Sequence, residues 1–122
     1  MEEGWVTSSV ASEFSELRLW SVELVARATR SSPEVRDQLR ELSDRLGGAQ
    51  AVMLRRRPVP EAYRVFFRQI GLDPDVDCIP VEALMLERLR TGGFVSRNSL
   101  DDALTVAVME TGVGVWRSTR IG

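Results

Sequence analysis

Apolar residues recur every three or four positions along much of this chain, and that spacing is typical of one face of an α-helix. In the segment from Pro33 to Leu46, for example, Val35, Leu39 and Leu42 fall on one stripe. Each such segment starts at a Pro or Ser, which suit the first turn, and stops at Gly, which suits the left-handed C-terminal position. The pattern therefore predicts four helices, over residues 33–46, 60–70, 80–91 and 99–111.

Alternating apolar and polar positions indicate strands between these helices. Between Leu17 and Ala26, the side chains of Trp20, Val22 and Leu24 share one face. Strands are predicted at Trp5–Val10, Leu17–Ala26, Gln50–Leu54 and Val113–Trp116. Because helices and strands do not alternate regularly, the sequence predicts a single α+β domain over residues 1–122, whose first helix covers a sheet.

Three of the predicted helices carry wide apolar faces. The face with Tyr63, Phe66 and Phe67 is either core or a stacking platform for bases, and helical periodicity alone accounts for core packing. Residues 103–109 are apolar nearly all round, and the next helix upstream has a wide apolar arc made of Val81, Leu84, Met85, Leu86 and Leu89. We therefore expect both helices to be well buried.

Composition narrows the classes of function. Of the 122 residues, 43% are hydrophobic and 28% are charged, which suits a globular domain with a modest core. The net charge of −2 excludes a strong overall basic field, so a nucleic acid would need a local basic patch. All 16 basic residues are Arg, whose forked guanidinium can donate two hydrogen bonds to one phosphate or carboxylate.

The chain has no His and one Cys, so it lacks the commonest general base and metal ligand and cannot form an internal disulfide. We therefore predict no metal and no cofactor. Cys78 is either an inert buried thiol or the nucleophile of a small-molecule enzyme, and the lack of an activating His favours the inert thiol. No apolar run approaches the ~20 residues of a membrane span, and the N-terminus lacks a signal-peptide core, which predicts a cytoplasmic protein without membrane contact.

Two groups of polar residues are candidates for chemistry. Arg55, Arg56 and Arg57 precede a Pro-flanked turn and form either a solvated connector or a phosphate contact. Glu82 lies one turn before Leu86 at the edge of an apolar arc, so its carboxylate must be paired, cap the helix or reach water. Glu82 is therefore either a structural group of the first helical turn or a carboxylate that lines a pocket.

The central half of the chain carries polar and Gly residues in a characteristic order. A Tyr-Arg helix ends in Gly and is followed by a turn with Pro, a Glu-Ala-Leu helix with a later Arg, a Gly stop, a loop with Asn and a helix with Asp near its start. The residues concerned are Tyr63-Arg64, Gly71, Pro74, Glu82-Ala83-Leu84, Arg88, Gly92-Gly93, Asn98, Asp102 and Gly112. This order resembles the tRNA-editing domain of the bacterial phenylalanyl-tRNA synthetase β subunit, in the form of its free-standing relatives.

The resemblance implies a fold in which helices pack on a mixed or antiparallel β-sheet, and a function in binding the acceptor end of a tRNA. It also implies hydrolysis of mischarged aminoacyl-tRNA, in which a positioned water reacts and neither His nor metal is needed. On this hypothesis the catalytic residues are Glu82, Asn98 and Asp102, although Asp102 also fits a capping box begun by Ser99. The RNA-binding residues are Arg55, Arg56, Arg57 and Arg64.

The chain also departs from the family pattern. Family members often have Arg-Pro-Ser before the Glu, Pro-Ser-Ile-Asn in the loop and Asn in the last helix. Here these positions are Ile79-Pro80-Val81, Val95-Ser96-Arg97-Asn98 and Thr105. The lost polar positions favour an alternative function, a non-catalytic interaction or assembly module that keeps the fold.

Relatives usually continue for many tens of residues beyond the position of Gly114, with strands that complete the sheets. The chain is therefore either the N-terminal part of a longer editing-type domain or a naturally shorter version of it. An unfinished sheet would expose Val113, Val115 and Trp116. We expect a second copy, giving a homo-oligomer, or another chain to cover that edge.

Overall fold

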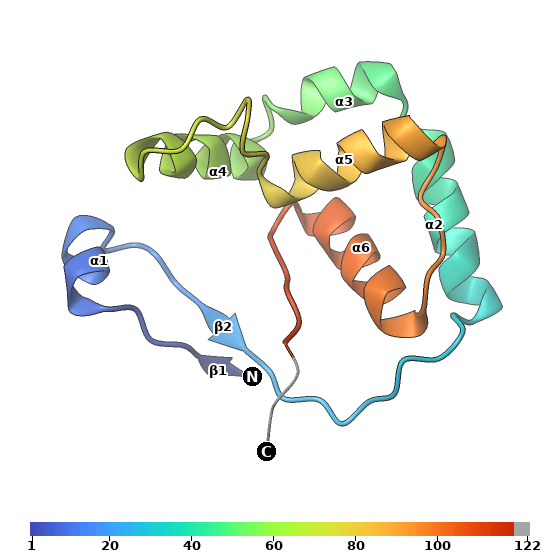
Figure 1. The fold of residues 1–122 in the computed structure, drawn as a ribbon, viewed down its shortest axis with the longest axis horizontal. Coiled ribbons are helices and arrows are strands. Elements are labelled where there is room, and N and C mark those ends of the chain that lie inside the picture. The colour runs from blue at the N-terminus through green and yellow to red at the C-terminus, as the bar shows by residue number, and fades with distance from the viewer. Residues whose placement is uncertain (119–122) are drawn as a thin grey trace.

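Helices make up most of the computed structural model, which describes residues 1–118 (Figure 1). In chain order the elements of these residues are β1 (Glu2–Glu3), α1 (Ser8–Glu13), β2 (Trp20–Ser21), α2 (Pro33–Arg45), α3 (Gly48–Leu54), α4 (Pro58–Gln69), α5 (Pro80–Thr91) and α6 (Ser99–Thr111). The α+β class holds in a general sense only, because the described part is mainly helical and its one sheet has two strands of 2 residues each.

The core lies among four of the helices. Both α2 and α5 pack against α6, and α3 packs against α5 (Figure 1). Leu42, Ile79 and Val81 belong to this core and are at most 2% exposed. The expectation that the first long helix covers a sheet is therefore wrong, because the apolar stripe of α2 is buried against α6.

The four predicted helices are confirmed as α2, α4, α5 and α6, because their start and stop signals are local. Ser32 caps α2, and its Oγ accepts a hydrogen bond from the N–H of Val35 at 3.3 Å. Gly92 and Gly112 end α5 and α6 with φ angles of +82° and +75°. Side chains strongly disfavour that left-handed backbone, so Gly is suited to both positions.

The strand predictions are mostly wrong for the described residues. Gln50–Leu54 lies within α3, and residues 8–10 of the first predicted strand lie within α1. Val113–Trp116 forms no ladder, and only Trp20–Ser21 of the strand predicted at 17–26 is paired. A strand needs a partner strand, whereas Leu54 gains burial in the helical core when its segment is a helix.

The first 30 residues form an extended N-terminal arm (residues 1–30). Its strands β1 and β2 are antiparallel, with Glu2 opposite Ser21, and the N–H of Gly4 donates to the carbonyl of Leu19 at 2.6 Å. The arm turns at α1, which lies near one end of α4 (Figure 1). There Phe14 meets Phe66 edge to face, with ring centroids 5.1 Å apart. The arm also meets α6 at Thr29, whose carbonyl accepts from the N–H of Ser99 at 2.7 Å.

The exposure of side chains on α4, α5 and α6 tests the expectation that their apolar faces are buried. Tyr63 and Phe67 are partly buried against the core, so the aromatic face of α4 is confirmed as a packing surface. Most of α6 is buried or half-buried, whereas Leu86 of α5 is 55% exposed, so the apolar arc of α5 is only partly covered. Within residues 1–118, none of these helices has both the length and the apolarity to cross a lipid bilayer.

The stretch after α6 is fixed at Gly114. The N–H of Gly114 donates to the hydroxyl of Tyr63 at 2.8 Å, and a Cβ on Gly114 would lie 2.9 Å from Cγ of Pro80. A larger residue would therefore force this segment away from α4 and α5. Val113 and Trp116 are exposed here, but they belong to an irregular stretch and not to the edge of a sheet.

We predict that Leu42→Ala lowers the free energy of unfolding by about 2–5 kcal/mol, because it removes buried methyl groups and leaves a cavity. Leu86→Ala is the matched control, and its exposed side chain should cost less than about 1 kcal/mol. Urea denaturation followed by circular dichroism measures both values. Equal losses for the two variants would contradict the assignment of the core to the α2–α6 contact.

Candidate functional site

A buried ion pair joins α4 to α5. The Nη1 atom of Arg64 donates to both carboxylate oxygens of Glu82, at 2.9 and 3.0 Å. The two side chains are only 8% and 9% exposed. Glu82 therefore meets the requirement set by its sequence position, because its carboxylate is paired where the apolar arc of α5 begins.

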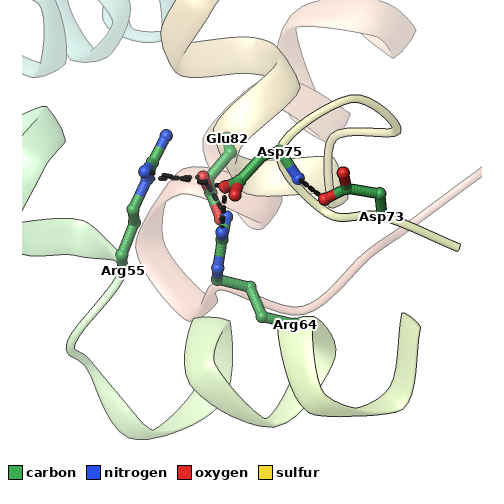
Figure 2. Close-up of polar contacts among 5 residues, drawn as sticks. All are labelled: Arg55, Arg64, Asp73, Asp75 and Glu82. Atoms are coloured by element: carbon green, nitrogen blue, oxygen red, sulfur yellow. Dashed lines mark hydrogen bonds and ion pairs between the residues drawn. The ribbon is translucent and has the colours of Figure 1, made fainter. Parts of the chain in front are cut away.

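Two further charged residues complete this ion pair (Figure 2). The Nε atom of Arg55, just after α3, donates to Oε1 of Glu82 at 3.1 Å. Arg64 also forms a short ion pair with Asp75, and the backbone N–H of Asp75 is held by Oδ1 of Asp73 at 3.0 Å. We call Arg55, Arg64, Asp75 and Glu82 the charge cluster, which connects α3, α4, the loop after α4, and α5.

The charge cluster shifts the pKa of two of its members, Arg64 and Asp75. Burial alone would lower the pKa of Arg64, but hydrogen bonds and charge attraction from Asp75 and Glu82 outweigh it, so the pKa is raised. The hydrogen bond from Arg64 holds the pKa of Asp75 below its usual value. Both shifts favour the charged forms, so the Arg64–Asp75 contact joins a guanidinium to a carboxylate.

Beside the charge cluster, α3 and α4 carry a concentration of Arg. Arg55, Arg56, Glu61, Arg64 and Arg68 line an open hollow of about 240 Å³. Arg57 lines a neighbouring hollow between the start of α4 and the end of α6. We call Arg56, Arg57 and Arg68 the arginine surface. Among the described residues 1–118, none forms a salt bridge with these three exposed side chains, so they are available to an external anion.

Asp102 lies elsewhere, at the start of α6, and is only 2% exposed. Its carboxylate accepts hydrogen bonds from Ser31, from Oγ of Ser96 at 2.6 Å and from the N–H of Arg97 at 2.9 Å. Burial would raise the pKa of Asp102, but these donors and the charge of Arg97 outweigh it and hold the pKa below its usual value. Asp102 thereby ties the loop before α6 to the segment that leads into α2.

Asn98 is the N-cap of α6. Its Oδ1 accepts from the N–H of Asp101 at 2.9 Å, and its Nδ2 donates to Oδ2 of Asp101 at 2.8 Å. The prediction that Ser99 caps this helix is wrong by one residue. The hydroxyl of Ser99 instead accepts from the N–H of Thr29 at 3.1 Å, because the segment before α2 passes beside it.

The predicted catalytic residues fall into two separate groups. Glu82 lies near the C-terminal end of α6, since its neighbour Val81 shares a hollow with Gly112. Asn98 and Asp102 lie at the other end of α6, a helix of 13 residues that is about 20 Å long (Figure 1). The structure therefore joins Glu82 to Arg55 and Arg64, but not to Asn98 and Asp102.

Sequence reasoning missed three residues that complete these groups. Asp75 follows Asp73-Pro74, a sequence that indicates only a turn, but the turn brings its carboxylate back onto α4. Ser31 was assigned only to the helix start at Ser32, and no signal in the sequence pairs it with a residue 71 positions away. Ser96 was noted only as a departure from the family loop.

The arrangement of these groups suits anion contact better than proton transfer. The buried carboxylates of Glu82 and Asp102 each already accept three hydrogen bonds, which leaves about one of the four lone pairs of each for a substrate or water. In the described part of the chain, His, Cys, Asp and Glu form no group of three or more that could hold a metal ion. The exposed guanidiniums remain the groups best able to meet a ligand.

Comparisons with known proteins give no further guide. No family model matches the chain, and neither the curated proteins nor the solved structures compared with it show a match.

We predict that Glu82→Gln lowers the free energy of unfolding by about 3–5 kcal/mol, because it leaves the buried Arg64 charge without its main partner. Glu61→Gln, at an exposed position on α4, is the matched control and should change stability by less than about 0.5 kcal/mol. Urea denaturation at pH 7 measures both. A loss for Glu82→Gln no larger than for Glu61→Gln would show that the ion pair does not hold α4 to α5.

The lowered pKa of Asp102 predicts a specific dependence of stability on pH. A carboxyl whose pKa is lower in the folded state than in the unfolded state stabilises the fold. This stabilisation is fully present at pH values above the unfolded-state pKa, near 3.8, and it is lost as the pH falls through the folded-state pKa. Asp102→Asn should therefore cost about 1–3 kcal/mol at pH 6 and progressively less below pH 4. Unfolding curves between pH 2.5 and 7 measure the difference.

Asp44→Asn, at an exposed position on α2, is the control and should remain close to the wild type throughout that range. A stability difference for Asp102→Asn that stays constant down to pH 2.5 would contradict the assigned hydrogen bonds.

Proposed function

We propose that this chain binds the acceptor end of a tRNA through backbone phosphates that contact the arginine surface. The observation that carries the proposal is the group of three exposed Arg side chains, Arg56, Arg57 and Arg68, beside the hollows of α3 and α4. A guanidinium can donate two parallel hydrogen bonds to a phosphate, and it remains charged at any physiological pH. The resemblance of residues 63–112 to a tRNA-editing domain adds the acceptor end as the expected ligand.

The uneven distribution of charge along the chain supports this choice of surface. Residues 55–68 contain five Arg and one Glu, although the whole chain has a net charge of −2. Two of these Arg, Arg55 and Arg64, are occupied by Glu82 and Asp75, so they support the surface while the other three face solvent. Three phosphate contacts predict modest affinity and a salt dependence with a slope near −2 for single-stranded RNA.

Hydrolysis by the three predicted catalytic residues has less support. Glu82 is buried and already accepts three hydrogen bonds from Arg64 and Arg55, which leaves little room for it to orient a water. Asn98 and Asp102 are engaged in capping and in loop hydrogen bonds at the other end of α6. We therefore propose binding without hydrolysis by these residues. A non-catalytic assembly module is the second candidate, favoured by the apolar side chains exposed on the N-terminal arm.

We predict that the double variant Arg56→Gln/Arg57→Gln weakens tRNA binding about tenfold or more and lowers the salt slope by about 1 to 2, because two phosphate contacts are lost. Fluorescence anisotropy with labelled tRNA at several salt concentrations measures both quantities. The matched control is Arg40→Gln/Arg90→Gln, which removes two exposed Arg from α2 and α5. Equal effects of the two double variants would contradict binding at the arginine surface.

The acceptor end is tested with the same protein and a tRNA that lacks its unpaired 3′ nucleotides. Weaker binding of this shortened tRNA supports the proposal, and unchanged binding contradicts it. Incubation with tyrosine attached to phenylalanine-specific tRNA tests hydrolysis, and we expect no loss of ester beyond that in buffer. If the wild type accelerates ester loss and a folded Glu82→Ala variant does not, Glu82 has a catalytic role and the proposal of binding without hydrolysis is wrong.

A further inference from the structure

This chain exposes a large surface for its mass. A folded monomer of 13.7 kDa is expected to expose about 6,600 Å², whereas this chain exposes 8996 Å². The excess of about 2,400 Å² exceeds the ~800 Å² that each partner buries in an interface of standard size. The chain therefore has enough uncovered surface for a stable interface.

One part of the arm is exposed throughout and rich in apolar side chains. Every residue from Arg18 to Arg30 is exposed. The exposed apolar side chains of this part are Leu19, Trp20, Val22, Leu24 and Val25. A concentration of exposed apolar groups on one extended segment is typical of an interaction surface.

Within residues 1–118, no strand pairs with the second backbone edge of the same segment. Leu19 bonds to Gly4 across the β1–β2 ladder, so in an extended strand the peptide groups of Trp20, Val22 and Leu24 face the opposite edge. The existing ladder has only 2 residues in each strand. A two-stranded hairpin of this kind is marginal in water, and further strands stabilise it.

The sequence of this edge is complementary to itself. When two copies run antiparallel with Val22 facing Val22, every apolar residue of the segment faces another apolar residue. The facing pairs are Leu19 with Val25, Trp20 with Leu24, and Ser21 with Glu23. The alternative register centred on Glu23 would set two carboxylates against each other, which is unfavourable. The centre at Val22 also uses the open peptide groups of the even-numbered residues.

We propose that two copies of this chain associate through the segment Leu19–Val25, antiparallel about a two-fold axis at Val22. The result is a four-stranded sheet in the order β1–β2–β2–β1, with an apolar stripe of Trp20, Val22 and Leu24 from both copies. This arrangement pairs the open edge and brings the exposed apolar groups of both copies into contact across it, and the two-fold axis closes the assembly at two copies.

The charge of the arm argues against two other occupants. Residues 1–30 contain five Glu and three Arg, so the side chains of the arm carry a net negative charge, which disfavours RNA and the surface of an anionic membrane. A second copy carries the same charge, but in the proposed register no two like charges face each other. The second copy is therefore the occupant that the residues of this edge favour.

Sedimentation equilibrium of the full chain tests the association, and a dimer is expected at micromolar concentration. Val22→Asp should make the protein monomeric, because the two-fold axis sets the two new carboxylates directly opposite each other. Val52→Asp on α3 is the matched control, since Val52 is 67% exposed and Val22 is 56% exposed. A monomeric wild type, or a dimer that Val22→Asp leaves intact, would overturn the proposal.

Disulfide trapping tests the register. In a Cys78→Ser background, Val22→Cys should form a linked dimer on mild oxidation, because the Cα atoms of a hydrogen-bonded antiparallel pair are about 5.5 Å apart. Val25→Cys should not, because Val25 faces Leu19 and the two introduced thiols lie far apart. Equal or faster linking through Val25→Cys would overturn the register, and with it the proposed interface.

Discussion

The buried ion pair between Arg64 and Glu82 is the interaction on which the arrangement of α3, α4 and α5 depends. Burying two charges is costly unless each is neutralised and its hydrogen bonds are made. Here Glu82 accepts from Arg64 and Arg55, and Arg64 donates to Asp75 as well. This combination fixes α4, whose packing on the core otherwise depends on partly buried residues such as Tyr63 and Phe67.

The same ion pair determines which charges remain for a ligand. Because Arg55 and Arg64 are engaged with carboxylates, the net positive potential of this region comes from Arg56, Arg57 and Arg68. The charge cluster therefore serves as a support that holds α3 and α4 together beneath the arginine surface. A residue that the sequence marks as a candidate catalyst, Glu82, is in this account a structural partner of that surface, and the proposed function is binding.

The sequence was informative where structure is local. Helix ends depend on adjacent residues such as Ser32 and Gly92, so four helices could be predicted. Strands depend on distant partners, and the strand expected at Gln50–Leu54 could not be judged from its own residues. The apolar arc around Glu82 predicts that its carboxylate needs a partner. It does not predict that the partners are Arg64 and Arg55. The partner of Asp102 is even harder to predict, because Ser31 lies 71 positions away in the sequence. Only the packing of α2 on α6 brings Ser31 close to Asp102.

The central claim is that the arginine surface on α3 and α4 contacts RNA phosphates, and an NMR titration tests it most directly. Labelled protein is titrated with an RNA hairpin that reproduces a tRNA acceptor stem with its unpaired 3′ end, and the backbone amide shifts are followed. The account predicts that the largest shifts lie between residues 54 and 69 and that they decrease as salt is raised. Shifts concentrated around Asn98 and Asp102, or no shifts at saturating RNA, would contradict it.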